Sequence, residues 1–447
     1  MRVHFLPMPS VTVLPVDDAQ RELLHNEIHA RPTARIRLPA LVVYVAVLNE
    51  GISREQESEH LRRLPGQDHL RAEQLTGNFL RLRFATHTVK WERHTEFTRY
   101  SIVQHLPEHA YLGASRPELL SELMVPPAWL AAIPGRTIAA IKLVMTHGDL
   151  SAPEETMALA RQWFGDASLV ASVVGNSGHS WAVTDFLVGP SGFERVLVVT
   201  PSSTSPTRAG RLSQRLLEME TYRLMALRGL PVTKQLGPVL AQSETQLLEI
   251  TGRLENKKAS DQELLDQLVG LATRVERATA EHAYRFSATR AYDSLVQQRL
   301  AELREQPLPG TQTIGEFLQR RLSPAMATVA ATAQRLGSLA ERITRASALL
   351  RTRVDIATEE QNHQLLEKLT RGQELQLRLQ ITVEGLSIAA ISYYVIGLLL
   401  YLAKALHGLG LPINPEVTVG LAVPVVLWGV WRMTRRIHQA LHKDKGV

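Results

Sequence analysis

The 447-residue sequence contains no cysteine. This absence excludes disulfide bonds, thiolate metal sites and cysteine nucleophiles. Aromatic residues make up only 5% of the chain, and part of the +6 net charge lies in the basic tail at residues 432–445. Nucleic-acid-binding surfaces combine clustered basic residues with stacking aromatics. We therefore expect no nucleic-acid partner.

The first 380 or so residues lack any long apolar run. Residues 1–20 carry several prolines and no apolar core of about 7–15 residues, which a secretory signal requires. Without such a signal, we expect this large part of the chain to stay in the cytoplasm.

Long apolar runs appear only near the carboxyl end. Leu386–Ala403 holds 18 uncharged residues, enough for a membrane-spanning helix, and Val417–Trp431 holds another 15. The sequence predicts two transmembrane helices, at about 385–404 and 417–432, forming a hairpin in the lipid bilayer within a segment 383–447. Basic residues flanking a membrane span favour the cytoplasmic side. The loop between the two spans has only Lys404 and His407, whereas five basic residues follow the second span: Arg432, Arg435, Arg436, Lys443 and Lys445. This indicates a multi-pass protein of the bacterial inner membrane with both termini cytoplasmic.

Residues 1–200 show the pattern of an α+β domain. Alternating or β-rich runs predict seven strands: 41–48, 79–84, 97–103, 137–144, 169–174, 181–188 and 195–199. The Pro-Ser-Gly turn at 190–192 predicts a hairpin between the last two. Amphipathic stretches predict helices at 17–30, 53–64, 117–123 and 153–163.

A linker-like segment at 200–207 separates this domain from a region rich in Leu, Ala, Arg, Gln and Glu. This composition predicts long helices over residues 201–382. Ser260 with Glu263, and Thr313 with Glu316, resemble capping boxes, and Pro324 suits a first helical turn. Apolar residues then recur at steps of three and four, which predicts a coiled-coil stalk that continues into the first span. Such a stalk needs partners, and we expect a homo-oligomer.

Several segments together resemble a bacterial family of uncharacterised membrane-anchored proteins, a domain of unknown function. They are residues 29–32, 91–97, 184–186, 210–212, 220–223, 284–288, 351–354 and 382–387, and they span nearly the whole chain. The resemblance implies membrane anchoring and no particular chemistry.

The architecture is also similar to that of the CorA-type divalent cation transporters. Pro415-Glu416 and Pro424-Val425-Val426 are similar to the loop and second helix of that family. The Gly-Met-Asn signature is absent, and residues 402–407 stand in its place. Lys404 would oppose a cation at the outer mouth.

The first span carries a polar stripe. Glu384, Ser387, Tyr394 and Tyr401, with Ile391 and Leu398 between them, follow steps of three and four and share one helical face. In a symmetric oligomer this face could line a pore with an acidic ring at Glu384. Alternatively, Glu384 lies among the lipid headgroups and the tyrosines pack between helices.

Two clusters could hold a divalent cation. His25 and His29 lie one turn apart if the segment is helical, although the second also suits a helix end. In a predicted strand pair, alternation places Glu92, His94 and Glu96 on one face. A cross-strand ladder of ion pairs is the alternative use of that face.

No catalytic signature stands out. The glycine turns at 175–178 and 189–192 lack the Gly-Lys-Ser/Thr ending of a P-loop and predict simple turns. We expect a non-enzymatic, membrane-anchored scaffold or sensor without a cofactor. A CorA-like cation channel is the alternative, and an enzyme using His94 with its acidic neighbours is a third hypothesis.

Overall fold

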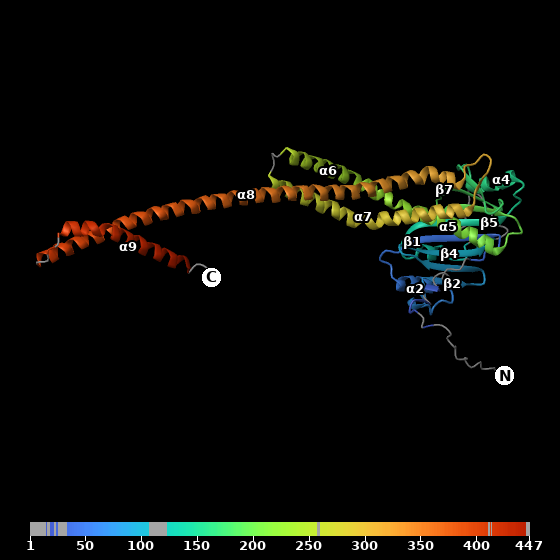
Figure 1. Ribbon diagram of the computed structural model, residues 1–447. Helices are drawn as coiled ribbons and strands as arrows, with labels where there is room; N and C mark the ends of the chain where they lie inside the picture. Colours follow the sequence, from blue (N-terminus) through green and yellow to red (C-terminus); the bar gives the residue numbers. More distant parts are fainter. Residues whose placement is uncertain are drawn as a thin grey trace, which may run out of the picture. The chain divides into compact units, whose positions relative to one another are not determined.

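In the computed structural model the chain divides into two compact units, Met1–Ala346 and Ser347–Val447 (Figure 1). The structure describes residues 34–106, 123–256, 260–409 and 414–443, together with residues 15, 18–21, 24, 25 and 412. The predicted helix at 117–123 and most of the one at 17–30 lie outside these residues.

The first unit is built around one mixed sheet, to which nine strands among the described residues contribute. Their order is β2-β3-β4-β1-β5-β8-β7-β6-β9. Only the β5–β8 pair is parallel among these described strands. The strands are β1 (Ala40–Leu48), β2 (Phe79–Arg83), β3 (His87–Arg93), β4 (Phe97–His105), β5 (Arg136–His147), β6 (Val170–Val174), β7 (Ser180–Val188), β8 (Glu194–Thr200) and β9 (Gln306–Pro307).

Helices cover both faces of the sheet, and β1 is therefore buried on both sides. Its odd-numbered residues, such as Leu41 and Val43, pack toward α2 (Arg54–Arg62), η1 (Ala72–Leu75), α3 (Pro127–Ala131) and α4 (Pro153–Phe164). Its even-numbered residues, such as Val42 and Tyr44, pack toward α5 (Pro206–Leu227), α7 (Asp261–Leu303) and the start of α8 (Ile314–Gly408). The alternation of a strand thus separates two apolar cores.

The seven strands predicted from the sequence are all present, and β7 and β8 form the predicted hairpin around Gly192. The helices predicted at 53–64 and 153–163 are α2 and α4, each within a few residues. The seven predicted strands did not include β3 and β9, although the alternation at residues 92–96 assumed a strand pair where β3 ends. Ser260 is the residue before α7, but its side chain makes no capping hydrogen bond.

The division of the chain differs from the predicted boundaries at residues 200 and 382. The segment 201–204 is only a short connection, because Ser205 caps α5 and α5 packs directly on the sheet. The strand β9 also joins the sheet from beyond residue 300. The first compact unit therefore extends to Ala346.

The helix α8 begins earlier than predicted. The backbone amide of Glu316 donates to the Thr313 hydroxyl at 3.1 Å, and the Thr313 amide donates to the Glu316 carboxylate at 3.1 Å, so the predicted capping box forms. Pro324 consequently lies inside the helix and not in its first turn. Between Leu336 and Ala346 the apolar positions of α8 are buried. Arg335 binds Glu244 of α6 (Gly229–Glu255), with its Nε 2.6 Å from Oε1.

The second unit contains the rest of α8 and α9 (Pro415–Lys443). Both helices are long and apolar enough to cross a membrane. Most leucines of α8 beyond Leu350 are exposed in the single chain, including Leu366 and Leu369. This exposure is expected for surfaces that lipid or other chains cover.

Candidate functional site

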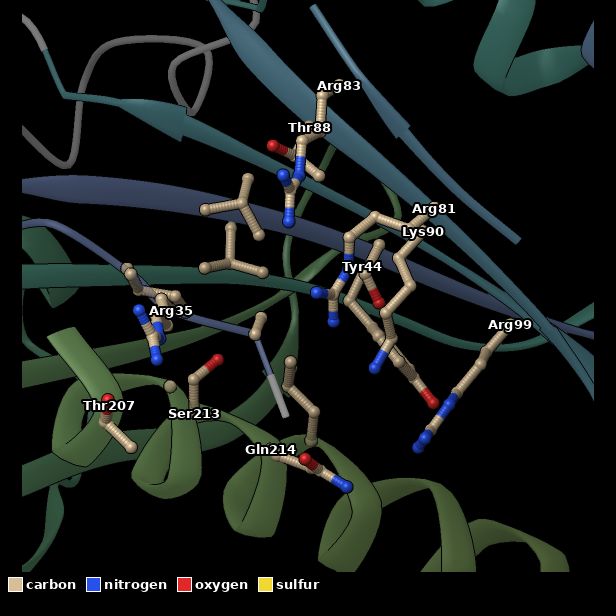
Figure 2. A pocket seen from close by; sticks show the side chains of 17 residues that line it. Arg35, Tyr44, Arg81, Arg83, Thr88, Lys90, Arg99, Thr207, Ser213 and Gln214 are labelled. Atoms are coloured by element: carbon tan, nitrogen blue, oxygen red, sulfur yellow. The ribbon is translucent and has the colours of Figure 1, made fainter. Parts of the chain in front are cut away.

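A pocket of about 560 Å³ lies between the sheet and α5, and we name it the β2–α5 pocket (Figure 2). Five basic side chains line it: Arg35, Arg81, Arg83, Lys90 and Arg99. None of the described residues that line it is acidic. Its volume falls within the range of about 300–1,000 Å³ that is typical of small-molecule sites.

Strand register brings the basic residues of the sheet to one face. Arg81 pairs with Lys90, Lys90 with Ser101, and Ser101 with Tyr44, which makes one row across four strands. The next row contains Arg83 and Thr88. Because alternate residues point to the same face of a strand, these polar groups all face α5. Figure 2 shows Arg81, Lys90 and Tyr44 gathered above that helix.

The opposite wall is the amino-terminal half of α5 and the segment 34–36. Thr207, Gly210, Gln214 and Leu217 follow helical steps of three and four and line the pocket on one face of α5. Segment 34–36 crosses so close that a Cβ at Gly210 would lie 1.6 Å from the Ala34 carbonyl oxygen. The Ile36 amide donates to the Pro206 carbonyl at 3.0 Å and fixes this crossing.

Arg99 and Lys90 pair with buried acidic residues behind the pocket. Arg99, 3% exposed, donates to Glu92 and, at 3.1 Å, to Glu218 of α5. Lys90 lies 3.0 Å from Glu92. Burial alone would raise the pKa of Glu92, but Arg99 and Lys90 outweigh it and lower that pKa to about 2. Glu92 is therefore ionised at neutral pH and holds both cations in place.

Arg35, Arg81 and Arg83 also line the pocket, and with no acidic residue in the described lining the wall carries excess positive charge. Burial and the like charge of Arg83 lower the pKa of Arg81, and the attraction of Glu92 opposes this shift without cancelling it. An anion between these guanidinium groups would relieve that repulsion. Arginine forks bind phosphate and carboxylate groups in a bidentate manner. The pocket thus has the composition of an organic-anion site, with Ile36 and Val42 offering apolar contact.

The predicted cluster of Glu92, His94 and Glu96 does not form one face. β3 ends at Arg93 and β4 begins at Phe97, so His94 and Glu96 lie in the connecting turn. Glu96 instead accepts hydrogen bonds from Arg285 at 2.6 Å and Arg228 at 3.3 Å. The His94 ring stacks on Phe97 with centroids 4.5 Å apart. Glu92 pairs with Arg99 on the neighbouring strand, as the alternative of a cross-strand ladder predicted, but Glu96 pairs with residues of the helical region and not with a strand.

Within the described part of the chain, no group of three or more His, Asp or Glu side chains could hold a metal ion. His25 is an exposed residue, and His29 lies outside the described residues. The predicted His25–His29 site therefore lies partly outside the described residues.

The predicted stripe of the first span lies on continuous helix, since α8 includes Glu384, Ser387, Tyr394 and Tyr401. The two tyrosines are 70% and 75% exposed in the single chain. Lipid, a neighbouring copy or a pore would each account for this exposure.

The β2–α5 pocket was missed by the sequence analysis. The available signal was Arg81 and Arg83 at alternate positions of a predicted strand. Lys90 and Arg99 join them only through register, and Gly210 marks a close approach that one sequence does not reveal.

The chain belongs to the family described as "Protein of unknown function (DUF3422)", whose model matches residues 16–441. This confirms the membership in an uncharacterised family that the sequence motifs predicted. No curated protein matches the chain. Among solved structures it is similar to the "structure of the full-length CmaX protein", with 14% identity over 66% of this chain and 89% of that chain. The TM-score of 0.19 is too low to support an argument, and similarity to the CorA-type transporters is not shown.

Proposed function

We propose that this member of the family is a membrane-anchored sensor or scaffold whose sheet domain binds a small organic anion in the β2–α5 pocket. It acts by binding, as a homo-oligomer, and not by catalysis. A hairpin of the two apolar helices anchors it in the bacterial inner membrane, with both termini in the cytoplasm.

The anchor is supported by two helices of sufficient length and apolarity. Arg432 and Arg436 follow the second apolar run, on the side that the positive-inside rule assigns to the cytoplasm. Exposed leucines of α8 between the sheet domain and the first span support assembly with further copies as a coiled coil.

The observation that carries the proposal is the positive charge of the β2–α5 pocket. Arg81 and Arg83 face Arg35 across a cavity of about 560 Å³, and the described lining has hydroxyl donors and apolar patches but no carboxylate. A phosphate or carboxylate with an apolar body fits this combination of charge, size and surface.

The test is calorimetric titration of the full-length chain, in phosphatidylcholine nanodiscs, with ADP as the probe. We expect Arg81→Gln/Arg83→Gln to weaken binding at least tenfold, or about 1.4 kcal/mol. The control Arg161→Gln/Arg290→Gln removes the same charge from exposed positions on α4 and α7. No ADP binding by the wild-type chain, or equal losses in both double variants, would refute the proposal.

A second candidate function is a CorA-like cation channel, and the exposed polar stripe of α8 favours it. Glu384 would form an acidic ring at the cytoplasmic end, with the two tyrosines further along the same face. Divalent-cation flux into liposomes containing the full chain tests this directly. We expect a channel to lose flux in Glu384→Gln and to keep it in Glu416→Gln, and a chain without flux would exclude the candidate.

A further inference from the structure

A second basic pocket, of about 250 Å³, lies on a different face of α5, and we name it the α5–α7 pocket. Arg208, Arg211 and Arg215 of α5 line it, together with Arg304 at the end of α7. The turn between β6 and β7 closes it with Asn176 and His179. None of these residues lines the β2–α5 pocket.

The arginines come from α5 and from the end of α7, and the β6–β7 turn binds one of them. Arg208, Arg211 and Arg215 occur at steps of three and four, so they share one face of α5. Arg304 adopts a left-handed conformation with φ of 49° and ends α7. Its guanidinium donates to Asn176 Oδ1 at 2.6 Å.

The turn at residues 175–178 is fastened to this pocket. The Gly175 amide donates to the Leu303 carbonyl at 2.8 Å, which ties the turn to the last residue of α7. Gly175 and Gly178 have φ of 87° and 69°, a conformation that glycine adopts without strain. The sequence predicted only a turn here, and the fold places that turn against four arginines.

The charges in the α5–α7 pocket are unbalanced. Glu302 is the single carboxylate among the described residues that line it. It lies 3.3 Å from Arg215 and also accepts a hydrogen bond from Arg299 at 2.8 Å. Arg208, Arg211 and Arg304 therefore add positive charge that Glu302 does not offset.

His179 adds a neutral polar group. Its Nε2 lies 3.0 Å from the Thr204 hydroxyl. Burial and the nearby Arg208 lower the pKa of His179, which favours its neutral form.

We propose that the α5–α7 pocket binds a small phosphate-type oxyanion, such as orthophosphate, pyrophosphate or the terminal phosphate of a larger ligand. Arginine forks at several angles match the tetrahedral array of phosphate oxygens better than a single planar carboxylate. The pocket is smaller than the usual range of about 300–1,000 Å³ for drug-sized ligands. Bound phosphate would connect α5, the end of α7 and the β6–β7 turn.

The experiment uses the full-length chain in phosphatidylcholine nanodiscs, titrated calorimetrically with inorganic pyrophosphate. We expect Arg208→Gln/Arg211→Gln to weaken binding at least tenfold and Arg304→Gln at least threefold. The charge-matched control Arg161→Gln/Arg290→Gln should stay within twofold of wild type. Arg304→Gln serves alone if the α5 double variant does not fold.

Three results would overturn this proposal. In the first, pyrophosphate binds the α5 variant as tightly as wild type, or the charge-matched control loses as much affinity. In the second, Arg81→Gln/Arg83→Gln alone abolishes binding, which assigns pyrophosphate to the β2–α5 pocket and leaves the proposed function intact. In the third, succinate competes as well as pyrophosphate, which shows a site for carboxylates or acidic peptides.

Discussion

Replacing Gly210 with alanine tests how closely the segment 34–36 must approach α5. The new Cβ would lie 1.6 Å from the Ala34 carbonyl oxygen and 2.7 Å from its carbon. Non-bonded heavy atoms prefer about 3.5–4.0 Å, so the segment must move by about 2 Å. Both blocking atoms are backbone, so no side-chain rotation relieves the clash.

The size of the effect follows from what the movement breaks. The 3.0 Å hydrogen bond from Ile36 to Pro206 is lost, at about 0.5–1.5 kcal/mol. Ile36, 2% exposed, loses most of its burial, which is worth about 1.5–3 kcal/mol in full. Alanine returns about 1 kcal/mol through its higher helix propensity. The net expectation is a loss of about 2 kcal/mol, because steric displacement exceeds the propensity gain.

Gly270→Ala is the matched control. It also lies within a helix, α7, but apart from its chain neighbours and the backbone of its own helix, no atom of the described residues lies within 4 Å of the position that a Cβ would take there. It should gain about 1 kcal/mol of stability from propensity alone. A shift of about 2 °C per kcal/mol is typical of large domains. We therefore expect the apparent Tm to fall by about 4 °C in Gly210→Ala and to rise by about 2 °C in the control.

The assay is tryptophan-fluorescence melting of the full-length chain in detergent, followed by ADP titration. Gly210→Ala should also weaken ADP binding, since segment 34–36 forms one wall of the β2–α5 pocket. If the two alanine variants shift the apparent Tm in the same direction, the close approach at Gly210 is not what the structure describes.

Three further predictions concern buried charge and assembly. Burial and a nearby arginine lower the pKa of His60 to about 4, whereas histidine in the unfolded chain binds a proton below about pH 6.5. The free energy of unfolding therefore decreases as the pH is lowered from about 6.5 towards 4, by about 2 kcal/mol at pH 5. His60→Phe should abolish that acid-side decrease in Tm, and an unchanged pH profile would contradict it. Arg99→Met should cost about 3 kcal/mol by depriving the buried carboxylates of Glu92 and Glu218 of one of their cationic partners; adding Glu92→Gln should restore part of the Tm, whereas additive losses would argue against coupling. Leu366→Asp/Leu369→Asp should lower the mass of the detergent-solubilised assembly, and an unchanged mass would exclude this stretch of α8 from the oligomer interface.

The strands were predictable where apolar residues alternate or run together, as in β1 and β5. The strand β3 was missing from the seven predicted strands, and only its end was assigned to a strand pair, because polar residues occupy most of its positions. Lys90 and Glu92 are both buried there, and their burial is tolerated because Lys90 pairs with Glu92 and Glu92 also pairs with Arg99. A pattern of apolar residues does not reveal a strand whose buried positions are ion pairs.

The start of α8 shows two local signals in competition. Thr313 with Glu316 predicts a helix start at 314, and Ser323-Pro324 predicts another ten residues later. The capping box forms, and the proline lies inside the helix. Ile314, Leu318 and Leu322 are buried in the second core, so packing of this first stretch outweighs the lost hydrogen bond at Pro324.

Neither pocket was predictable, because each depends on pairs of segments that are distant in the sequence. The β2–α5 pocket joins Arg81 to Gln214, and the α5–α7 pocket joins Asn176 to Arg304. The sequence did show a helix from Arg208 onward that is rich in arginine. It did not show that two adjacent faces of that helix line different cavities.

This placement makes α5 the element through which binding would reach the rest of the domain. Its Gly210 lies against segment 34–36, its Glu218 binds Arg99 of the sheet and Arg299 of α7, and its arginines line a pocket with the end of α7. The chain continues from α7 through β9 into α8, whose first turns pack in the same core as α5. An anion in the α5–α7 pocket would therefore stabilise the arrangement of α5 and α7 from which α8 begins. A sensor requires that kind of continuity between its ligand site and the helix that leads to its anchor.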